Sequence, residues 1–426
     1  MKFLKNLIWA ATLGAGIVTS ASAERAEPTD EMKAKVDGAL QRLTLWEQPA
    51  NPEERRTMKI IYWTPSDREP APGYRERLSR AMRHIENYYR GEMQRLGLGE
   101  RTIGLEPAEN DPEQVKIHLV TGKKPYSEYN VQSGNAIREE CRAVMKEAGV
   151  DIDQETIVIF CNMSNWDPEK RAINQNSPYY AWGVSTKGTA WQVDSPILDP
   201  EFIPVKDQHV RDGQYGHISL GRYNSIFIGG IAHELGHALG LPHCRECQAE
   251  RSVYGTALMG SGNFTYGEEL RGEGPGSYLI LPHALKLASH PQFSKSIKEM
   301  NRRGDRKLTD EVVGVTEDGM NVHYEVKVDG TPEVYVVIAY FDPEGNSDYN
   351  SAITCAIPDE NGRVVLRSSE LEKGKQYQGR IVFVHVNGDA SGWSSSGTVV
   401  NRFDFSTAPD GKVTIGGLGA AAKAGE

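Results

Sequence analysis

The sequence contains little cysteine and no excess of positive charge. Its 426 residues include 48 Lys and Arg against 58 Asp and Glu, which gives a formal net charge of −10. Nucleic acids and anionic membranes attract basic proteins, so this balance argues against either as a partner. There are five cysteines, and an odd count leaves at least one of them outside any disulfide within the chain.

Long apolar runs are also absent after the first 23 residues, where no stretch approaches the roughly 20 apolar residues of a membrane-spanning helix. Residues 1–23 have the pattern of a secretory signal peptide: two lysines, a mostly apolar stretch, and an A-x-A cleavage site that ends at Ala23. The alternative is a membrane anchor, for which the apolar run is short. We therefore predict a mature chain that begins near Glu24 and is secreted or periplasmic.

Residues 233–243 read HELGHALGLPH. His233 and His237 are four residues apart, so both side chains lie on one face of a helix and can reach one metal ion. Gly240 can take the left-handed conformation that ends the helix, and the turn brings His243 towards the same ion. Three neutral imidazoles leave a position open for water, as in catalytic zinc sites. Glu234 points about 100° further round the helix, so we predict that it lies beside that water as a general base.

This long motif, H-E-x-x-H-x-x-G-x-x-H, resembles the zinc motif of the metzincin metallopeptidases. The resemblance implies a methionine turn beneath the zinc, and residues 256–262 (TALMGSG) fit it with Met259; the alternative is an ordinary buried methionine in a tight loop. Some families of the clan place a tyrosine ligand two residues after the methionine, where this chain has Ser261. Cys244 follows the third histidine and matches none of the well-known subfamilies, so the resemblance is to the clan and not to a subfamily.

Cys244 and Cys247 form a C-x-x-C pair directly after the zinc motif. One interpretation is a secondary metal site, but this would need two more ligands, and the sequence has no second C-x-x-C. The other is a disulfide, either within the pair or to Cys141 or Cys161, which an oxidising compartment allows. We favour disulfide chemistry and leave the pairing open, including that of Cys355.

Upstream of the motif, strand and helix patterns alternate. Strands are expected at 58–63, 115–120 and 156–161, and helices at 74–96 and 136–148. This order predicts a mixed, mainly parallel sheet backed by helices, and the resemblance implies the same for a catalytic domain over residues 57–300.

Residues 181–194 are strand-like but contain Lys187-Gly188, so they form either one edge strand or a hairpin. In the family, an edge strand above the zinc pairs with an extended substrate, and we expect that role here. The remaining expectations for this domain are an irregular connection over 195–223, a cap of the zinc helix at Asn224 or Ser225, and a last helix over 278–297.

A different pattern begins after residues 301–306, which resemble a linker. Short alternating runs separated by turns predict a small antiparallel β-sandwich over residues 310–407, and we expect residues 408–426 to be a flexible tail. At the other end, residues 24–56 are polar and form either an N-terminal extension or a short pro-segment. They contain no cysteine, which excludes the cysteine-switch latency of some metzincins.

The sequence thus predicts an α+β, metzincin-like catalytic domain followed by an all-β sandwich, with one catalytic Zn2+. The expected function is that of a secreted zinc endopeptidase, in which a zinc-activated water attacks a protein or peptide substrate and Glu234 is the general base. Tyr254 or Tyr266 is a candidate to stabilise the developing oxyanion, and substrate-binding residues are not assigned. The alternative is a catalytically silent or self-restricted zinc domain whose β-sandwich binds a cell surface or a glycan. The intact Glu234 argues against that alternative.

Overall fold

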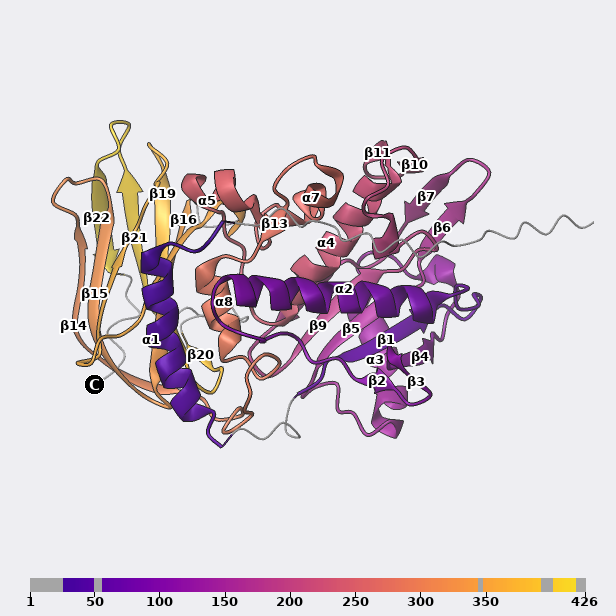
Figure 1. Ribbon diagram of the computed structural model, residues 1–426, viewed down its shortest axis with the longest axis horizontal. Helices are drawn as coiled ribbons and strands as arrows, with labels where there is room; N and C mark the ends of the chain where they lie inside the picture. The colour runs from indigo at the N-terminus through magenta and orange to yellow at the C-terminus, as the bar shows by residue number, and fades with distance from the viewer. Residues whose placement is uncertain (1–25, 50–55, 344–347, 392–400, 419–426) are drawn as a thin grey trace, which may run out of the picture.

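The computed structural model describes residues 26–49, 56–343, 348–391 and 401–418, so the expected signal peptide lies outside the described residues. A larger lobe of mixed α/β structure lies beside a smaller lobe of antiparallel strands (Figure 1). Within the described part of the chain, no helix is long and apolar enough to cross a membrane.

The central sheet of the larger lobe has the strand order β4-β1-β5-β9-β8. Its strands are β1 (Lys59–Thr64), β4 (Ile117–Thr121), β5 (Thr156–Cys161), β8 (Tyr180–Gly183) and β9 (Gly188–Val193). β1 is parallel to β4 and β5, and β5 is parallel to β9, whereas β8 is antiparallel to β9. The prediction of a mixed, mainly parallel sheet is therefore confirmed. Of the two alternatives for residues 181–194, the structure contains the hairpin, and β8 is the edge strand.

Helices cover both faces of this sheet. They are α2 (Tyr74–Arg95), α3 (Gly134–Glu147) and α4 (Leu220–Ala238). Successive strand residues point to opposite faces. Tyr62 and Phe160 accordingly share a core with residues of α2 and α4, whereas Ile61 and Ile159 pack with residues of α3. The zinc motif thus begins on a helix that one face of the sheet supports.

A second sheet, of order β11-β10-β7-β6, precedes α4. Its strands are β6 (Ser164–Asp167), β7 (Ala172–Gln175), β10 (His209–Asp212) and β11 (Gly216–Ser219); smaller elements of this region are β2 (Pro107–Ala108), β3 (Asp111–Val115), η2 (Tyr126–Glu128) and η3 (Pro200–Phe202). Residues 195–223 are therefore not the irregular connection that the sequence predicts. The hairpin of β10 and β11 is largely exposed, so its residues carry little hydrophobic periodicity that could reveal it.

Short elements follow the zinc motif. They are α5 (Gln248–Tyr254), β12 (Thr256–Ala257), α6 (Gly262–Thr265), α7 (Glu268–Arg271), β13 (Ser277–Tyr278) and α8 (Leu281–Ala288). The prediction of one helix over 278–297 is wrong in length, because α8 ends at Ala288. Pro291 follows three residues later, and proline has no N–H with which to continue the helical hydrogen bonds.

The smaller lobe contains two antiparallel sheets, β14-β15-β18 and β17-β16-β19-β21-β22, with β20 paired to β19. The elements are β14 (Asp305–Val315), β15 (Val322–Thr331), β16 (Val334–Pro343), η4 (Asp348–Asn350), β17 (Ala352–Ala356), β18 (Arg363–Arg367), β19 (Gln376–His385), β20 (Ala390–Ser391), β21 (Arg402–Thr407) and β22 (Val413–Leu418). Val326 and Leu366 of the first sheet share an apolar core with Ala339 and Phe405 of the second.

Two boundaries in this lobe differ from the prediction. β14 begins at Asp305, within the expected linker and before residue 310. β22 occupies 413–418, within the expected flexible tail, because this segment pairs with β21 and buries Val413. The tail is rich in glycine and alanine, and this composition does not indicate that its first residues pair with another strand.

The hydrophobic core of the larger lobe extends to one face of the second sheet of the smaller lobe. All of β16 is buried: Ala339 faces the core of the smaller lobe, whereas Ile338 and Tyr340 belong to the core of the larger one. Helix α1 (Asp30–Trp46) lies against the smaller lobe in Figure 1, where it contacts both β16 and α8. Its residue Leu43 is fully buried in the core of the larger lobe. Residues of the predicted N-terminal extension or pro-segment therefore form part of the packed structure.

Candidate metal centre

The helix that carries the motif, α4, is buried along nearly all of its length. It starts earlier than the cap predicted at Asn224 or Ser225. Ser219 is the N-cap residue, and its hydroxyl oxygen accepts a hydrogen bond from the backbone N–H of Arg222 at 3.1 Å. Asn224 lies inside the helix, where its side-chain amide donates to the backbone oxygens of Leu220 and Ile197.

The helix ends where Gly240 was expected to end it. Gly240 has φ +81°, in the left-handed region. Its N–H donates to the His237 oxygen at 2.9 Å, and the N–H of Leu241 donates to the Gly236 oxygen at 2.9 Å. This pair of bonds is a Schellman motif, which satisfies the last carbonyls of the helix and reverses the chain. The reversal returns His243 to the helix.

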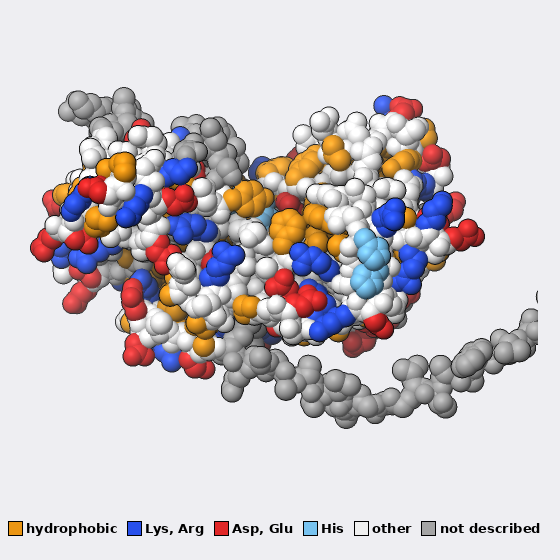
Figure 2. All heavy atoms as spheres, turned by 90° about the horizontal axis from the view of Figure 1, so that it is seen from above, with side chains coloured by type: hydrophobic (Ala, Val, Ile, Leu, Met, Phe, Trp, Pro, Cys, Tyr) orange, Lys and Arg blue, Asp and Glu red, His pale blue; other side chains and the backbone are white. Residues whose placement is uncertain are grey.

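The three predicted ligands come together at their Nε2 atoms. His243 Nε2 lies 3.2 Å from His233 Nε2 and 2.9 Å from His237 Nε2. Among the described residues, this trio is the one group of three or more His, Cys, Asp or Glu side chains arranged to hold a metal ion. Figure 2 shows hydrophobic side chains gathered beside the notch between the two lobes.

The chemistry of the three imidazoles suits a cation. Nδ1 of His233 lies 2.7 Å from the Leu258 oxygen, and Nδ1 of His237 lies 2.8 Å from the Leu241 oxygen. The backbone oxygen accepts a hydrogen bond from the Nδ1–H group, which leaves the lone pair of each ring on Nε2. Burial, followed by the neighbouring histidines, lowers the pKa of His233 to about 4 and that of His243 to about 2. The rings of His233 and His243 are therefore neutral at pH 7, and a cation at the point where the three Nε2 lone pairs converge would relieve the repulsion between them.

Glu234 lies next to His233 on α4 and is largely buried. Burial raises the pKa of its carboxyl group to about 7. A carboxyl group with a pKa near neutrality can both accept and return a proton at physiological pH. This property agrees with the role predicted from the sequence, that of a general base beside the ligands.

Met259 lies beneath the helix at a place where the backbone approaches closely. It is 1% exposed, and a Cβ at Gly236 would overlap its sulfur atom. The preceding residue, Leu258, supplies the oxygen behind His233. The segment thus both fills the space under α4 and orients one of the predicted ligands.

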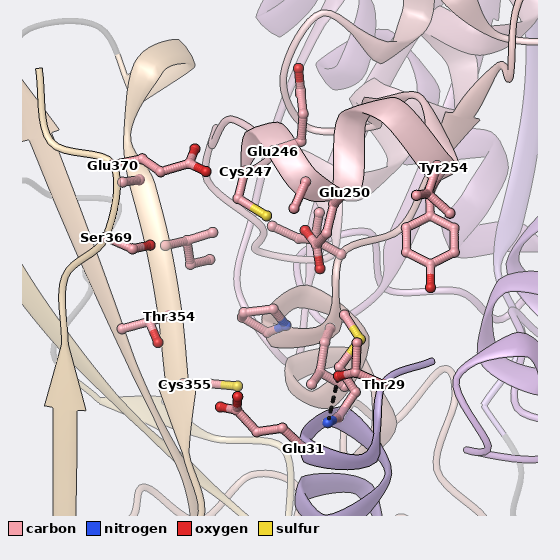
Figure 3. A pocket seen from close by; sticks show the side chains of 18 of the residues that line it. Thr29, Glu31, Glu246, Cys247, Glu250, Tyr254, Thr354, Cys355, Ser369 and Glu370 are labelled. Carbon is pink, nitrogen blue, oxygen red and sulfur yellow. Dashed lines mark hydrogen bonds between the residues drawn. The ribbon is translucent and has the colours of Figure 1, made fainter. Parts of the chain in front are cut away.

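The disulfide predicted for Cys244 or Cys247 is not formed, since none of the five cysteines, all of which are described, takes part in one. Cys244 is fully buried, its N–H donates to the Met259 oxygen at 3.2 Å, and its Sγ lies 3.8 Å from His283 Nδ1. Cys247 instead lines a cavity of about 550 Å3 between the lobes (Figure 3), with Cys355 on the opposite side. Neither cysteine belongs to a second metal cluster among the described residues.

Two tyrosines considered for the oxyanion make their contacts elsewhere. The hydroxyl of Tyr254 donates to the Glu27 oxygen at 3.0 Å, and the ring of Tyr266 packs against Tyr88. A residue that sequence reasoning missed, Tyr349, stacks instead on His243, with ring centroids 3.6 Å apart. Tyr349 belongs to η4 in the smaller lobe, and nothing in its sequence context links it to a motif more than a hundred residues earlier.

The edge strand β8 lies close to the end of α4. A Cβ at either Gly183 or Gly188 would overlap the backbone of Ala238, so the β8–β9 hairpin rests directly on the last turn of the motif helix. Only glycine permits this approach. The end of the strand expected to pair with a substrate therefore lies against the residue that follows His237.

No protein-family model matches this chain, and no curated protein matches it in sequence. Among solved structures, wild-type OgpA from Akkermansia muciniphila is similar, with a TM-score of 0.67 and 23% sequence identity over 84% of this chain and 95% of that chain. The chain shares the OgpA fold. Catalytically inactive OgpA in complex with an O-glycopeptide substrate, glycodrosocin, matches with a TM-score of 0.65 and 23% identity, over 79% of this chain and 91% of that one. At this level of identity the likeness concerns the arrangement of the chain, over both lobes.

Proposed function

We propose that this protein is a zinc-dependent endopeptidase that acts outside the cytoplasm. The observation that carries the proposal is the convergence of the Nε2 atoms of His233, His237 and His243, and the buried Glu234 next to His233 on the same helix supports it. The metzincin-like motif supports the same assignment. Zinc held by the three imidazoles would supply Lewis acidity, which polarises a peptide carbonyl and makes a water molecule acidic near neutral pH.

Residues of the chain carry out the proton transfers, support the metal ligands and bind the substrate. Glu234 accepts a proton from the attacking water as the new bond to the carbonyl carbon forms, and returns it to the leaving nitrogen as the C–N bond breaks. Met259 forms the apolar floor under the ligands. The outer edge of β8 (Tyr180–Gly183) offers backbone donors and acceptors to an extended peptide, whatever the side chains of that peptide are.

We propose O-glycopeptides as the first substrate class to test. The solved complex of inactive OgpA contains such a substrate, and this chain shares its fold. An unglycosylated peptide of the same sequence and a general substrate such as casein distinguish a glycan-dependent peptidase from a general one. The predicted signal peptide is tested separately: N-terminal sequencing of the exported protein should show that the mature chain begins at Glu24.

The decisive variant is Glu234→Gln, which keeps the size of the side chain and removes the base. We expect zinc content to remain and cleavage to fall by about 10²–10⁴-fold, the usual contribution of a general base. Glu147→Gln is the matched control, because Glu147 is exposed at the end of α3. Cleavage by Glu234→Gln at the parental rate would refute the proposed role. If the parent cleaves no substrate, with or without a chelator, the rival function of a binding protein is favoured.

A further inference from the structure

The three predicted zinc ligands are not supported in the same way. Backbone oxygens lie behind Nδ1 of His233 and His237, at 2.7 and 2.8 Å. In the described part of the chain, the structure shows no such hydrogen bond for Nδ1 of His243. Metal-ligating histidines ordinarily depend on a partner of this kind, which fixes the orientation of the ring. His243 also lies beyond the helix, on a segment that is free of regular secondary structure, so its ring needs another support.

Tyr349 contacts the imidazole ring of His243 directly. Its ring stacks on that of His243 with centroids 3.6 Å apart and an interplanar angle of 24°, and it lies 6.3 Å from the ring of His233. Aromatic stacking restrains the plane of both rings. Tyr349 is 51% exposed, so the stacked pair lies at the protein surface and not in a core.

The loop that carries Tyr349 is attached to the segment that carries His243. Arg245, two residues after His243, donates from its backbone N–H to the Ser351 oxygen at 2.9 Å and from Nε to the Asn350 oxygen at 3.1 Å. The main-chain oxygens of the two residues that follow the tyrosine are thus bound from the segment that carries His243. The position of Tyr349 is therefore set by the contact between the lobes and not by its own short helix alone.

A second set of hydrogen bonds joins the segment after His243 to the smaller lobe. The guanidinium of Arg245 also donates to the backbone oxygen of Glu370, and the carboxylate of Glu370 accepts from the N–H of Gln248 at 2.9 Å. Figure 3 shows Glu370 reaching from the smaller lobe towards the start of α5. The smaller lobe is consequently fastened to the chain on both sides of Cys247.

We propose that Tyr349 is a positioning residue for the metal centre: the smaller lobe completes the site by holding the imidazole of His243 in its ligating orientation. The proposal rests on the proposed zinc site. It assigns the smaller lobe a part in the site itself, in addition to any ligand that the lobe binds elsewhere. The stacked face of the ring carries this role, and the hydroxyl group does not.

The test compares two substitutions at one position. Tyr349→Ala removes the ring, whereas Tyr349→Phe keeps the stack and removes only the hydroxyl. Loss of a partner that orients a ligand typically weakens metal binding by 10–100-fold, and this contact is half exposed, so we expect about tenfold for Tyr349→Ala. We expect Tyr349→Phe to stay within about twofold of the parent. Asn350→Ala is the matched control, because it changes an exposed side chain in the same turn and keeps the oxygen bound by Arg245.

Zinc affinity is measured by competition with a chromogenic chelator, and the geometry of the site by the visible spectrum of the cobalt-substituted protein. Both readouts are independent of peptide cleavage. The cobalt spectrum should change in Tyr349→Ala and match the parent in Tyr349→Phe. Thermal unfolding of the metal-free variants verifies that the fold is intact, as expected for an exposed ring.

A third variant tests the attachment of the loop. Arg245→Ala should weaken zinc binding by several-fold in the parent and have little further effect in Tyr349→Ala, because both changes release the same ring. Additive losses would contradict the shared mechanism. The proposal is overturned if Tyr349→Ala binds zinc within twofold of the parent with an unchanged cobalt spectrum, or if Tyr349→Phe is as weak as Tyr349→Ala. In either case a parent that binds zinc and cleaves peptides would leave the proposed function standing, whereas a parent that binds no zinc would refute both.

Discussion

Leu43 tests whether the two lobes form one cooperative structure. This side chain is fully buried in the core that contains residues of α1, α8 and β16, so it contacts the junction of the lobes. Replacement of a buried leucine by alanine loses transfer free energy and leaves a cavity, at a cost of about 3 kcal/mol. Unfolding entropy of about 2.1 cal/mol/K per residue amounts to roughly 0.9 kcal/mol/K for the 426-residue chain. Leu43→Ala should therefore lower Tm by about 3 °C.

Differential scanning calorimetry measures the effect, and Leu45→Ala provides the matched control. Leu45 lies on the same helix but is 71% exposed, so its replacement should change Tm by less than about 0.5 °C. If the lobes share a core, the parent unfolds in one transition and Leu43→Ala shifts all of it. Two separate transitions, with only one of them shifted, would show that the lobes unfold independently and would refute the reasoning. An unchanged Tm for Leu43→Ala would show that α1 does not stabilise the fold.

Two further predictions concern the site. Burial raises the pKa of Glu234 to about 7, so its base form is lost as pH falls through that value, and kcat/KM should fall about tenfold per pH unit on the acid side. A bound cation stabilises the ionised carboxylate of Glu234, so it moves the acid-side fall of kcat/KM to lower pH. A pH–rate profile that is flat from about pH 4 to 8 would contradict the role of Glu234. Gly236→Ala adds a Cβ that overlaps the sulfur of Met259, and overpacking of this kind costs about 1–3 kcal/mol in urea unfolding. Gly91→Ala on α2 meets nothing within 4 Å and should instead be neutral or stabilising, so equal effects of the two changes would contradict the close packing.

Most of the candidate metal site could be predicted because its residues lie close together in the sequence. Two predicted ligands and the predicted base lie within about one helical turn, and Gly240 determines where that helix ends, so spacing alone predicts that His243 returns. The parallel sheet was predictable for a similar reason, since buried strands are apolar throughout and their flanking helices are strongly amphipathic. Elements with weak local patterns were missed, as in the exposed hairpin of β10 and β11.

The tertiary structure determined which segments, distant in the sequence, contact one another. From the sequence, Cys244 is a candidate for a disulfide, but the fold encloses it beside His283 and it forms none. The stacking of Tyr349 on His243 depends on how two lobes meet, which pattern and spacing do not encode. A side chain's own sequence neighbours determine its helix or strand, whereas its contacts depend on which surfaces the whole chain buries together. Thus the predicted ligands and the predicted base were visible in the sequence, and the residue proposed to hold the third ligand became visible only in the assembled fold.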